Sequence, residues 1–411
     1  MKRIALLLSC LAIISCKKDP KKETVVVKEF KKGTYRAALT VQDNKELPFL
    51  FELDEHNKIT VLNAEERIEV TDIEVRNDSV FIKMPVFDAV IQASLDEMSN
   101  LKGVYMKGPK NLKVPFVAMH DIYFRYPKFT TTHNPIAGKW EVTFSPGTEN
   151  EYKAVGVFKD GKDNMISGTF LTETGDYRFL EGALDDGLFK LSCFDGSHAF
   201  LFDAVVKEDS IVSGNFYSGN HYKEPWVAIK NDKFELTNPE ELTYLKKGYD
   251  KVEFSFPDLE GNMISLEDDR FKGKATIIQI MGSWCPNCLD ESKYLTKFYQ
   301  ANKDKDIQII ALAFENAKTH EKAVANLKRF KNRLGIGYDI LVAQVGSSSK
   351  LKAGEKLPML NHILSYPTTI YIDKKGKVRK IHTGFNGPAT GEKYTEFTTE
   401  FESFVAELAG E

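Results

Sequence analysis

Two cysteines separated by two residues stand where the character of the chain changes. Before them, Ala275 to Met281 is an apolar run rich in isoleucine, as in a buried strand. After Cys285-Pro286-Asn287-Cys288, apolar and aromatic residues recur at spacings of three and four from Leu289 to Tyr299, as in a helix. The pair therefore marks a junction between a strand and a helix, which constrains this part of the chain to an α/β fold.

The spacing places both sulfurs within bonding reach at the first turn of the predicted helix. The backbone N–H groups there are unpaired and the helix dipole is positive, so a thiolate at Cys285 is stabilised. Pro286 suits the first helical position because its missing N–H would have had no partner. We predict a redox-active pair in which Cys285 attacks a disulfide and Cys288 resolves the mixed disulfide, with a Cys285–Cys288 bond in the oxidised form.

Glu291 is the candidate acid/base beside this pair. It follows Cys288 by three residues, so one face of the helix carries both side chains. Gln279, in the middle of the apolar run, is an amide and cannot accept a proton in this way. We therefore predict that Glu291 exchanges a proton with Cys288; the alternative is a solvated helix residue without a role.

Two other interpretations of the pair are weaker. A structural zinc site needs four ligands, usually from two such pairs. Here Cys10, Cys16 and Cys193 show no paired spacing, and the eight histidines show no ligand spacing. A structural disulfide without turnover is the second interpretation, but closing so short a loop contributes little entropic stabilisation. We therefore expect neither a metal nor another cofactor.

Pro367 begins a second strand-like segment. Thr368 to Ile372 is made of β-branched and aromatic residues, which favour strands. Proline is tolerated at the first residue of a strand, and the bond before it can be cis. A cis bond would present the backbone of Tyr366 to an extended peptide, so Trp284, Tyr366 and Pro367 are the predicted substrate contacts.

From about Val252 to the C-terminus, the chain resembles the TlpA/ResA-type branch of the thioredoxin-like family. The matching positions are Trp284, Cys285, Cys288, Glu291, Pro367 with Thr368 and Thr369, the turn from Asp373 to Gly376, Gly384, and Phe256 to Gly261, which resembles the extra N-terminal hairpin of that branch. The resemblance implies a thioredoxin-like domain over residues 251–411, with a nucleophilic first cysteine, a resolving second cysteine, a buried glutamate that tunes the pair, and a cis proline. The dipeptide Pro286-Asn287 departs from those of the best-known members.

The resemblance also implies a function. The implied protein is a thiol–disulfide oxidoreductase that acts on protein disulfides or dithiols. We expect it to work as a reductase in the style of cytochrome c maturation factors, with electrons supplied by a transmembrane thiol carrier. Two alternatives stay open. One is a thiol peroxidase, which would need an activating hydroxyl and an arginine near the sulfur. The other is a non-enzymatic envelope lipoprotein whose N-terminal half binds a ligand or partner.

The first residues predict export from the cytosol. Met1-Lys2-Arg3 is basic and Ile4 to Ile14 is apolar, but too short to span a membrane. Ile13-Ile14-Ser15-Cys16 resembles a bacterial lipoprotein cleavage box, which implies a signal peptide over residues 1–16 and lipidation of Cys16; the alternative is an ordinary secretory signal. Residues 17–32 read as a polar tether. We expect a lipid-anchored protein of the bacterial cell envelope, facing the periplasm or the cell surface.

Residues 33–230 predict an all-β region in two copies, because short alternating runs are separated by Asp, Asn and Gly. We assign the copies to residues 33–128 and 136–230, each long enough for about eight strands in a barrel or a sandwich. The matching segments are Gly33 to Ala37 with Gly138 to Val142, Asp78 to Lys83 with Asp186 to Leu191, and Pro115 to Ala118 with Pro225 to Ala228.

This half carries no cluster of ionisable residues with catalytic spacing. We read its aromatic residues as core, and Cys193 as a small buried hydrophobe rather than a third redox thiol. The net charge of −3 gives no indication of a basic surface that would bind nucleic acid. The aromatic residues in question are Trp140, Phe158, Tyr217 and Trp226.

Three connecting segments carry expectations of their own. Residues 231–250 form a linker in which Asn238 caps a helix that ends at Gly248. Leu357 to Leu364 predicts a short helix before Pro367. The polar stretch from Gly346 to Lys356 should lie near the sulfurs, either as a recognition loop or as a neutral insertion.

Overall fold

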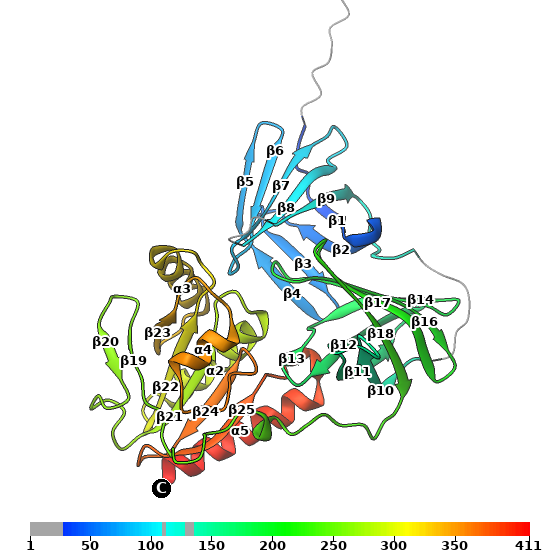
Figure 1. Ribbon diagram of the computed structural model, residues 1–411. Helices are drawn as coiled ribbons and strands as arrows, with labels where there is room; N and C mark the ends of the chain where they lie inside the picture. Colours follow the sequence, from blue (N-terminus) through cyan, green and yellow to red (C-terminus); the bar gives the residue numbers. More distant parts are fainter. Residues whose placement is uncertain (1–27, 109–111, 128–134) are drawn as a thin grey trace, which may run out of the picture.

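The computed structural model describes residues 28–108, 112–127 and 135–411. Figure 1 shows a first β module in blue and cyan, a second in green, and a C-terminal α/β domain in yellow to red. The predicted signal peptide, Cys16 and most of the tether lie outside the described residues. Within the described ranges, no helix is long and apolar enough to cross a membrane.

The first module is one antiparallel sheet in the order β4-β3-β2-β1-β9-β8-β7-β6-β5. Its two edges, β4 and β5, are consecutive in the sequence, so the sheet curls round without pairing its edges. The strands are β1 (Gly33–Thr40), β2 (Glu46–Leu53), β3 (Ile59–Asn63), β4 (Glu66–Val70), β5 (Asp72–Arg76), β6 (Ser79–Lys83), β7 (Ala89–Leu95), β8 (Leu101–Lys107) and β9 (Leu112–His120), with a 3-10 turn at Gln42–Asn44.

The second module is an antiparallel sheet in the order β11-β10-β18-β17-β16-β15-β14-β12-β13, and β11 also pairs with β12, which closes the sheet into a barrel. Gly33 and Gly138 begin equivalent strands, and both have positive φ, 129° and 120°. The strands are β10 (Gly138–Phe144), β11 (Tyr152–Asp160), β12 (Met165–Thr172), β13 (Gly175–Asp176), β14 (Leu180–Asp185), β15 (Leu188–Phe194), β16 (Ala199–Lys207), β17 (Ser210–Ser218) and β18 (Tyr222–Lys230). The predicted all-β class is confirmed, and both modules are barrel-like.

The C-terminal domain has the thioredoxin-like fold that the sequence predicts. Its sheet runs β23-β22-β21-β24-β25. Strands β21, β22 and β23 are parallel, β24 is antiparallel to β21, and β25 is antiparallel to β24. Every residue of β21 and β24 is buried, so helices or loops cover both faces. The elements are β19 (Ser255–Pro257), β20 (Met263–Ser265), β21 (Ala275–Met281), α2 (Pro286–Asn302), β22 (Ile307–Phe314), α3 (His320–Leu334), β23 (Asp339–Gln344), α4 (Lys350–Lys356), β24 (Thr368–Ile372), β25 (Val378–Thr383), a 3-10 turn (Pro388–Thr390) and α5 (Glu392–Gly410).

One predicted helix ends earlier than expected and a second is absent, both for one reason. The linker helix α1 (Pro239–Leu242) begins at the predicted cap, Asn238, but ends long before Gly248. Beyond it Leu245 forms an isolated bridge with Leu360, the Lys246 N–H donates to the Met359 carbonyl, and a turn follows. The same pairing replaces the helix predicted between residues 357 and 364. Hydrogen bonds between the two segments, Lys246 N–H to the Met359 carbonyl and Asn361 N–H to the Tyr244 carbonyl, satisfy backbone groups that a continuous helix would have paired internally.

The cores of the two modules differ. The barrel of the second module holds its own cluster, which contains Trp140, Phe158, Trp226 and the fully buried Cys193. The first module shares one continuous cluster with the C-terminal domain. Phe194, Ala199, Leu201 and Tyr217 of the second module also belong to this shared cluster. Packing therefore ties both modules to the C-terminal domain, and the predicted core role of the aromatic residues and Cys193 is confirmed.

Candidate active site

Cys285 lies at the end of the loop that follows β21, and it is the N-cap residue of α2. Its sulfur accepts a hydrogen bond from the Cys288 N–H at 3.2 Å, and Pro286 occupies the first helical turn. Both cysteines are free thiols in this structure. Cys285 is 6% exposed and Cys288 is 0% exposed, so Cys285 is the cysteine of the pair that is accessible to solvent.

The loop before β24 lies against Cys285. The Cys285 thiol donates to the carbonyl of Tyr366 at 3.3 Å, and the Tyr366–Pro367 bond is cis. The Trp284 ring stands edge-on to the Tyr366 ring, with centroids 5.5 Å apart, and its indole N–H donates to the Phe314 carbonyl. The residues predicted to contact substrate are thus brought together around one sulfur.

Glu291 is buried beneath the pair, in a polar pocket inside the domain. Its two carboxyl oxygens accept hydrogen bonds from the Gln279 amide at 2.7 Å and from the Thr369 hydroxyl at 2.6 Å. Burial raises the pKa of Glu291 to about 7, although both hydrogen bonds oppose the shift. Near neutral pH this carboxyl group can therefore both take and return a proton.

Ionisation of the Cys288 thiol is strongly disfavoured. Burial, then the hydrogen bond and charge of Cys285, raise the pKa of Cys288 well above its ordinary value, and the charge of Glu291 adds to the shift. Cys288 is therefore protonated at neutral pH. Glu291 is close enough to Cys288 for the two charges to interact.

A second buried carboxylate, which the sequence interpretation missed, holds the loop before Cys285. Glu315 accepts hydrogen bonds from both the N–H and the hydroxyl of Ser283, each at 2.7 Å. Burial raises the pKa of Glu315. Its position directly after β22 is the signal that could have indicated it, because the ends of neighbouring parallel strands meet at one edge.

The polar stretch before α4 also comes close to the pair. α4 begins at Lys350, with Ser349 as its cap. Lys350 lies close enough to Cys285 for their charges to interact, and burial lowers the pKa of Lys350. The predicted proximity of this stretch to the sulfurs is thus present in the structure.

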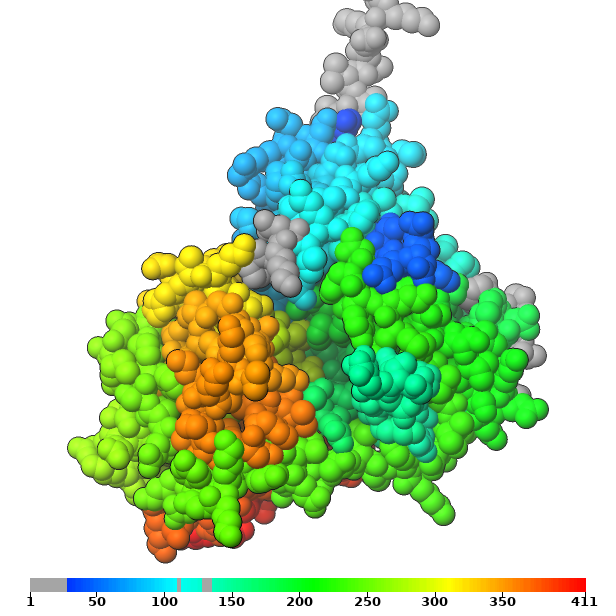
Figure 2. Space-filling view, viewed as in Figure 1, coloured from blue at the N-terminus to red at the C-terminus, as the bar shows by residue number. Residues whose placement is uncertain are grey.

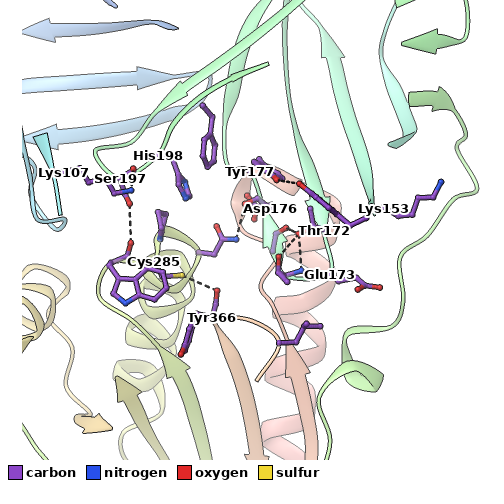
Figure 3. Close-up of a pocket in the computed structure, with 18 of the residues that line it drawn as sticks. Lys107, Lys153, Thr172, Glu173, Asp176, Tyr177, Ser197, His198, Cys285 and Tyr366 are labelled. Carbon is purple, nitrogen blue, oxygen red and sulfur yellow. Dashed lines mark hydrogen bonds between the residues drawn. The ribbon is translucent and has the colours of Figure 1, made fainter. Parts of the chain in front are cut away.

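The second β module supplies a group of site residues that no sequence pattern indicated. A cleft of about 820 Å³ separates Cys285 from that module. Figure 3 shows Ser197, His198 and Tyr177 across the cleft from Cys285 and Tyr366. These residues come from loops and strand ends far from Cys285 in the sequence, which is why spacing could not reveal them.

Among these residues of the second module, the Arg178 side chain is the most deeply buried. Its guanidinium forms ion pairs with Glu66 of the first module, Asp195 of the second and Asp290 of α2, and is 2% exposed. It also donates to the Pro286 carbonyl at 3.1 Å. Burial alone would raise the pKa of Asp195, but pairing with His198 and Arg178 holds this pKa below its usual range. One cation thus joins all three parts of the chain.

In the part of the chain that the structure describes, no three His, Cys, Asp or Glu side chains converge on a position that could hold a metal ion.

Comparison with known proteins agrees with this geometry. Residues 247–396 match the Redoxin family model. The thiol–disulfide oxidoreductase ResA of Halalkalibacterium halodurans is 31% identical over 139 residues, which are 34% of this chain and 69% of that protein. The chain belongs to the ResA-type thiol–disulfide oxidoreductases. ResA of Geobacillus thermodenitrificans is 30% identical over 35% of this chain and 73% of its own length.

Solved structures resemble part of this ResA-type chain. A thiol–disulfide oxidoreductase from Bacteroides fragilis is 22% identical and covers 36% of this chain and 99% of its own, with a TM-score of 0.27. The thioredoxin domain of an oxidoreductase from Bacteroides vulgatus is 24% identical and covers 38% and 99%, with the same TM-score. The β modules lie outside the region of family similarity.

Proposed function

We propose that this ResA-type oxidoreductase reduces protein disulfides in the bacterial cell envelope through Cys285 and Cys288. One observation carries the proposal: Cys285 faces a cleft at the start of α2, while Cys288 is fully buried beside a carboxyl group with a pKa of about 7. An accessible nucleophile backed by a buried resolving thiol is what an exchange reaction in two steps requires.

The Cys285 thiolate attacks one sulfur of the substrate disulfide, forming a mixed disulfide and releasing one substrate thiolate, which takes up a proton. Glu291 then accepts the proton of Cys288, and the Cys288 thiolate attacks the Cys285 sulfur. The second substrate thiolate leaves, the substrate has gained two electrons, and the enzyme holds a Cys285–Cys288 disulfide.

Turnover then needs an external dithiol that reduces this disulfide. A transmembrane thiol carrier fits that role for an enzyme held at the membrane by a lipidated Cys16. The basic start of the chain, its short apolar run and the cleavage box support that location. Trp284, Tyr366 and Pro367 border the nucleophile and would bind the substrate strand.

An equilibrium redox titration of the full chain in thiol buffers tests the proposal. We expect a single two-electron couple that is lost in Cys285→Ser, with a potential near that of thioredoxin, about −270 mV, for a reductase. A potential near about −120 mV would favour disulfide formation instead. No couple at all would overturn the enzymatic function and would favour the β modules as a binding unit.

A further inference from the structure

The second β module forms one wall of the redox cleft. Its residues Thr174, Tyr177 and His198 line the same cavity as Cys285 and Tyr366. In Figure 2 the molecular surface is hollowed where the second module, in green, meets the C-terminal domain, in yellow and orange. The nucleophilic sulfur is therefore not on an open face of the domain, but at the side of a cleft.

The dipeptide between the two cysteines touches this wall directly. The Asn287 side chain donates to the Asp176 carbonyl at 3.1 Å, and the Pro286 carbonyl accepts from Arg178. The approach at Gly175 is so close that an added Cβ would lie 2.1 Å from the Asn287 amide nitrogen. The Pro286-Asn287 sequence, which departs from better-known relatives, thus has a partner within this chain.

Other loops of the redox site are held by the same wall. The Ser365 hydroxyl donates to the Thr174 carbonyl at 2.7 Å, and the Gly387 N–H donates to the Asp176 carboxylate at 2.6 Å. Across the cleft, the Ser197 hydroxyl donates to the Trp284 carbonyl at 3.4 Å. With the buried Arg178 pairs, these contacts anchor the module at several points, so the wall is a fixed part of the site.

The size of the cleft limits what can reach Cys285. Its volume, about 820 Å³, lies within the range of roughly 300–1,000 Å³ typical of sites for small ligands. A folded partner instead presents a broad surface, usually about 800 Å² on each side of the interface. A single extended segment fits the cleft, whereas the convex surface of a folded protein would meet the module first.

The lining adds a chemical preference. Aromatic side chains from both walls face the cavity, while its acidic and basic groups are mixed and favour neither sign. The aromatic residues are Tyr152, Tyr177, Phe200, Trp284 and Tyr366. Such a surface favours apolar side chains next to the reacting cysteine.

We infer that the second β module restricts the substrates of Cys285 to extended, unfolded segments in which apolar residues flank the cysteine, and excludes disulfides on folded proteins. The inference rests on the proposed function and narrows its substrate class. The occupant is a polypeptide segment, because the Tyr366 carbonyl beside Cys285 offers backbone hydrogen bonding to an extended chain.

The test compares one disulfide in two states of the same polypeptide. The full-length enzyme is assayed on a small folded protein with one solvent-exposed disulfide, and on a core-destabilised, unfolded variant with the same cysteines. Rates are divided by those with dithiothreitol, which corrects for intrinsic accessibility. We expect a corrected preference for the unfolded form of at least about tenfold, that is, about 1.4 kcal/mol. Equal corrected rates would overturn the inference.

Gly175→Ala tests the wall itself. Its Cβ would displace Asn287, and Gly175 has φ of 129°. We expect this variant to lose most of the preference for the unfolded substrate. The matched control is Gly248→Ala, at φ of 97° with open space around the added Cβ, which should keep the preference. An unchanged preference in folded Gly175→Ala would count against the wall. If that variant does not fold, the comparison with wild-type enzyme still decides.

A small aromatic disulfide separates this inference from the proposed function. If wild-type enzyme reduces neither that compound nor either polypeptide, the proposed function fails. If it reduces the small disulfide and treats folded and unfolded polypeptides alike, only the substrate inference fails.

Discussion

The Glu291 carboxylate accepts a hydrogen bond of 2.7 Å from the side-chain amide of Gln279. The side-chain carbonyl of Gln279 in turn accepts a hydrogen bond from the Ser292 hydroxyl at 3.0 Å. An amide in the middle of β21 thus orients the carboxyl group instead of serving as the acid/base. The Thr369 hydroxyl fixes the other oxygen. This arrangement holds a titratable group of fixed orientation within a core where an isolated charge would be costly.

The first prediction concerns the rate of resolution. If ionised Glu291 takes the proton of Cys288, the single-turnover rate from mixed disulfide to enzyme disulfide should rise with pH, with a midpoint near the Glu291 pKa of about 7. Glu291→Gln should remove that rise and slow resolution at pH 8 by roughly 100-fold, the usual contribution of a general base. Acid-quenched samples analysed by mass provide the measurement.

Thr369→Val is the graded control for this rate. The Thr369 hydrogen bond lowers the pKa of Glu291, so its loss should move the midpoint to higher pH while keeping the rise. A pH profile that is identical in wild type, Thr369→Val and Glu291→Gln would contradict the role of Glu291.

The same pKa predicts a pH-dependent stability. Because folding raises the Glu291 pKa from 4.5 to about 7, the protonated form is favoured in the folded state. This contribution is fully present below pH 4.5 and is lost as the pH rises through 7. Relative to Glu291→Gln, the wild type should lose about 3 kcal/mol of unfolding free energy over that range. Urea unfolding at several pH values measures it, and parallel curves for the two proteins would rule it out.

Trapping distinguishes the two cysteines. Because Cys285 is accessible and Cys288 is fully buried, Cys288→Ser should accumulate a mixed disulfide between Cys285 and the substrate. Cys285→Ser should accumulate none. Peptide mapping of the trapped species identifies the linked residue. Substrate attached to Cys288 in the second variant would reverse the assigned order of attack.

The residues at the redox pair could be predicted because their structure is local. A strand, a capping cysteine, a first-turn proline and a cis proline each leave a signature over a few neighbouring positions. The match to the Redoxin family model, residues 247–396, covers this same region. The approximate duplication of the β half was likewise visible, because Gly33 to Ala37 resembles Gly138 to Val142 in the sequence. In the structure both glycines begin a strand with positive φ.

The wall of the cleft could not be predicted, because it depends on long-range packing. Arg178 lies more than a hundred residues before Pro286 and reaches it only after the barrel has closed and docked. The two wrong helices have the same origin. Leu245 and Leu360 have helical surroundings in the sequence, but each pairs with the other in the fold. Local propensity is a weak prior where a tertiary partner offers the backbone an alternative.

The last prediction concerns the anchoring of the wall. Arg178→Met should leave Glu66, Asp195 and Asp290 without the cation that they share, and breaking such a buried set typically costs about 3–5 kcal/mol. Lys293→Ala is the matched control, because Lys293 pairs with the same Asp290 at 3.1 Å but its side chain is 47% exposed. Exposed pairs contribute about 0–1 kcal/mol. Denaturant unfolding of the full chain should therefore separate the two variants clearly, and similar losses in both would mean that Arg178 does not anchor the modules.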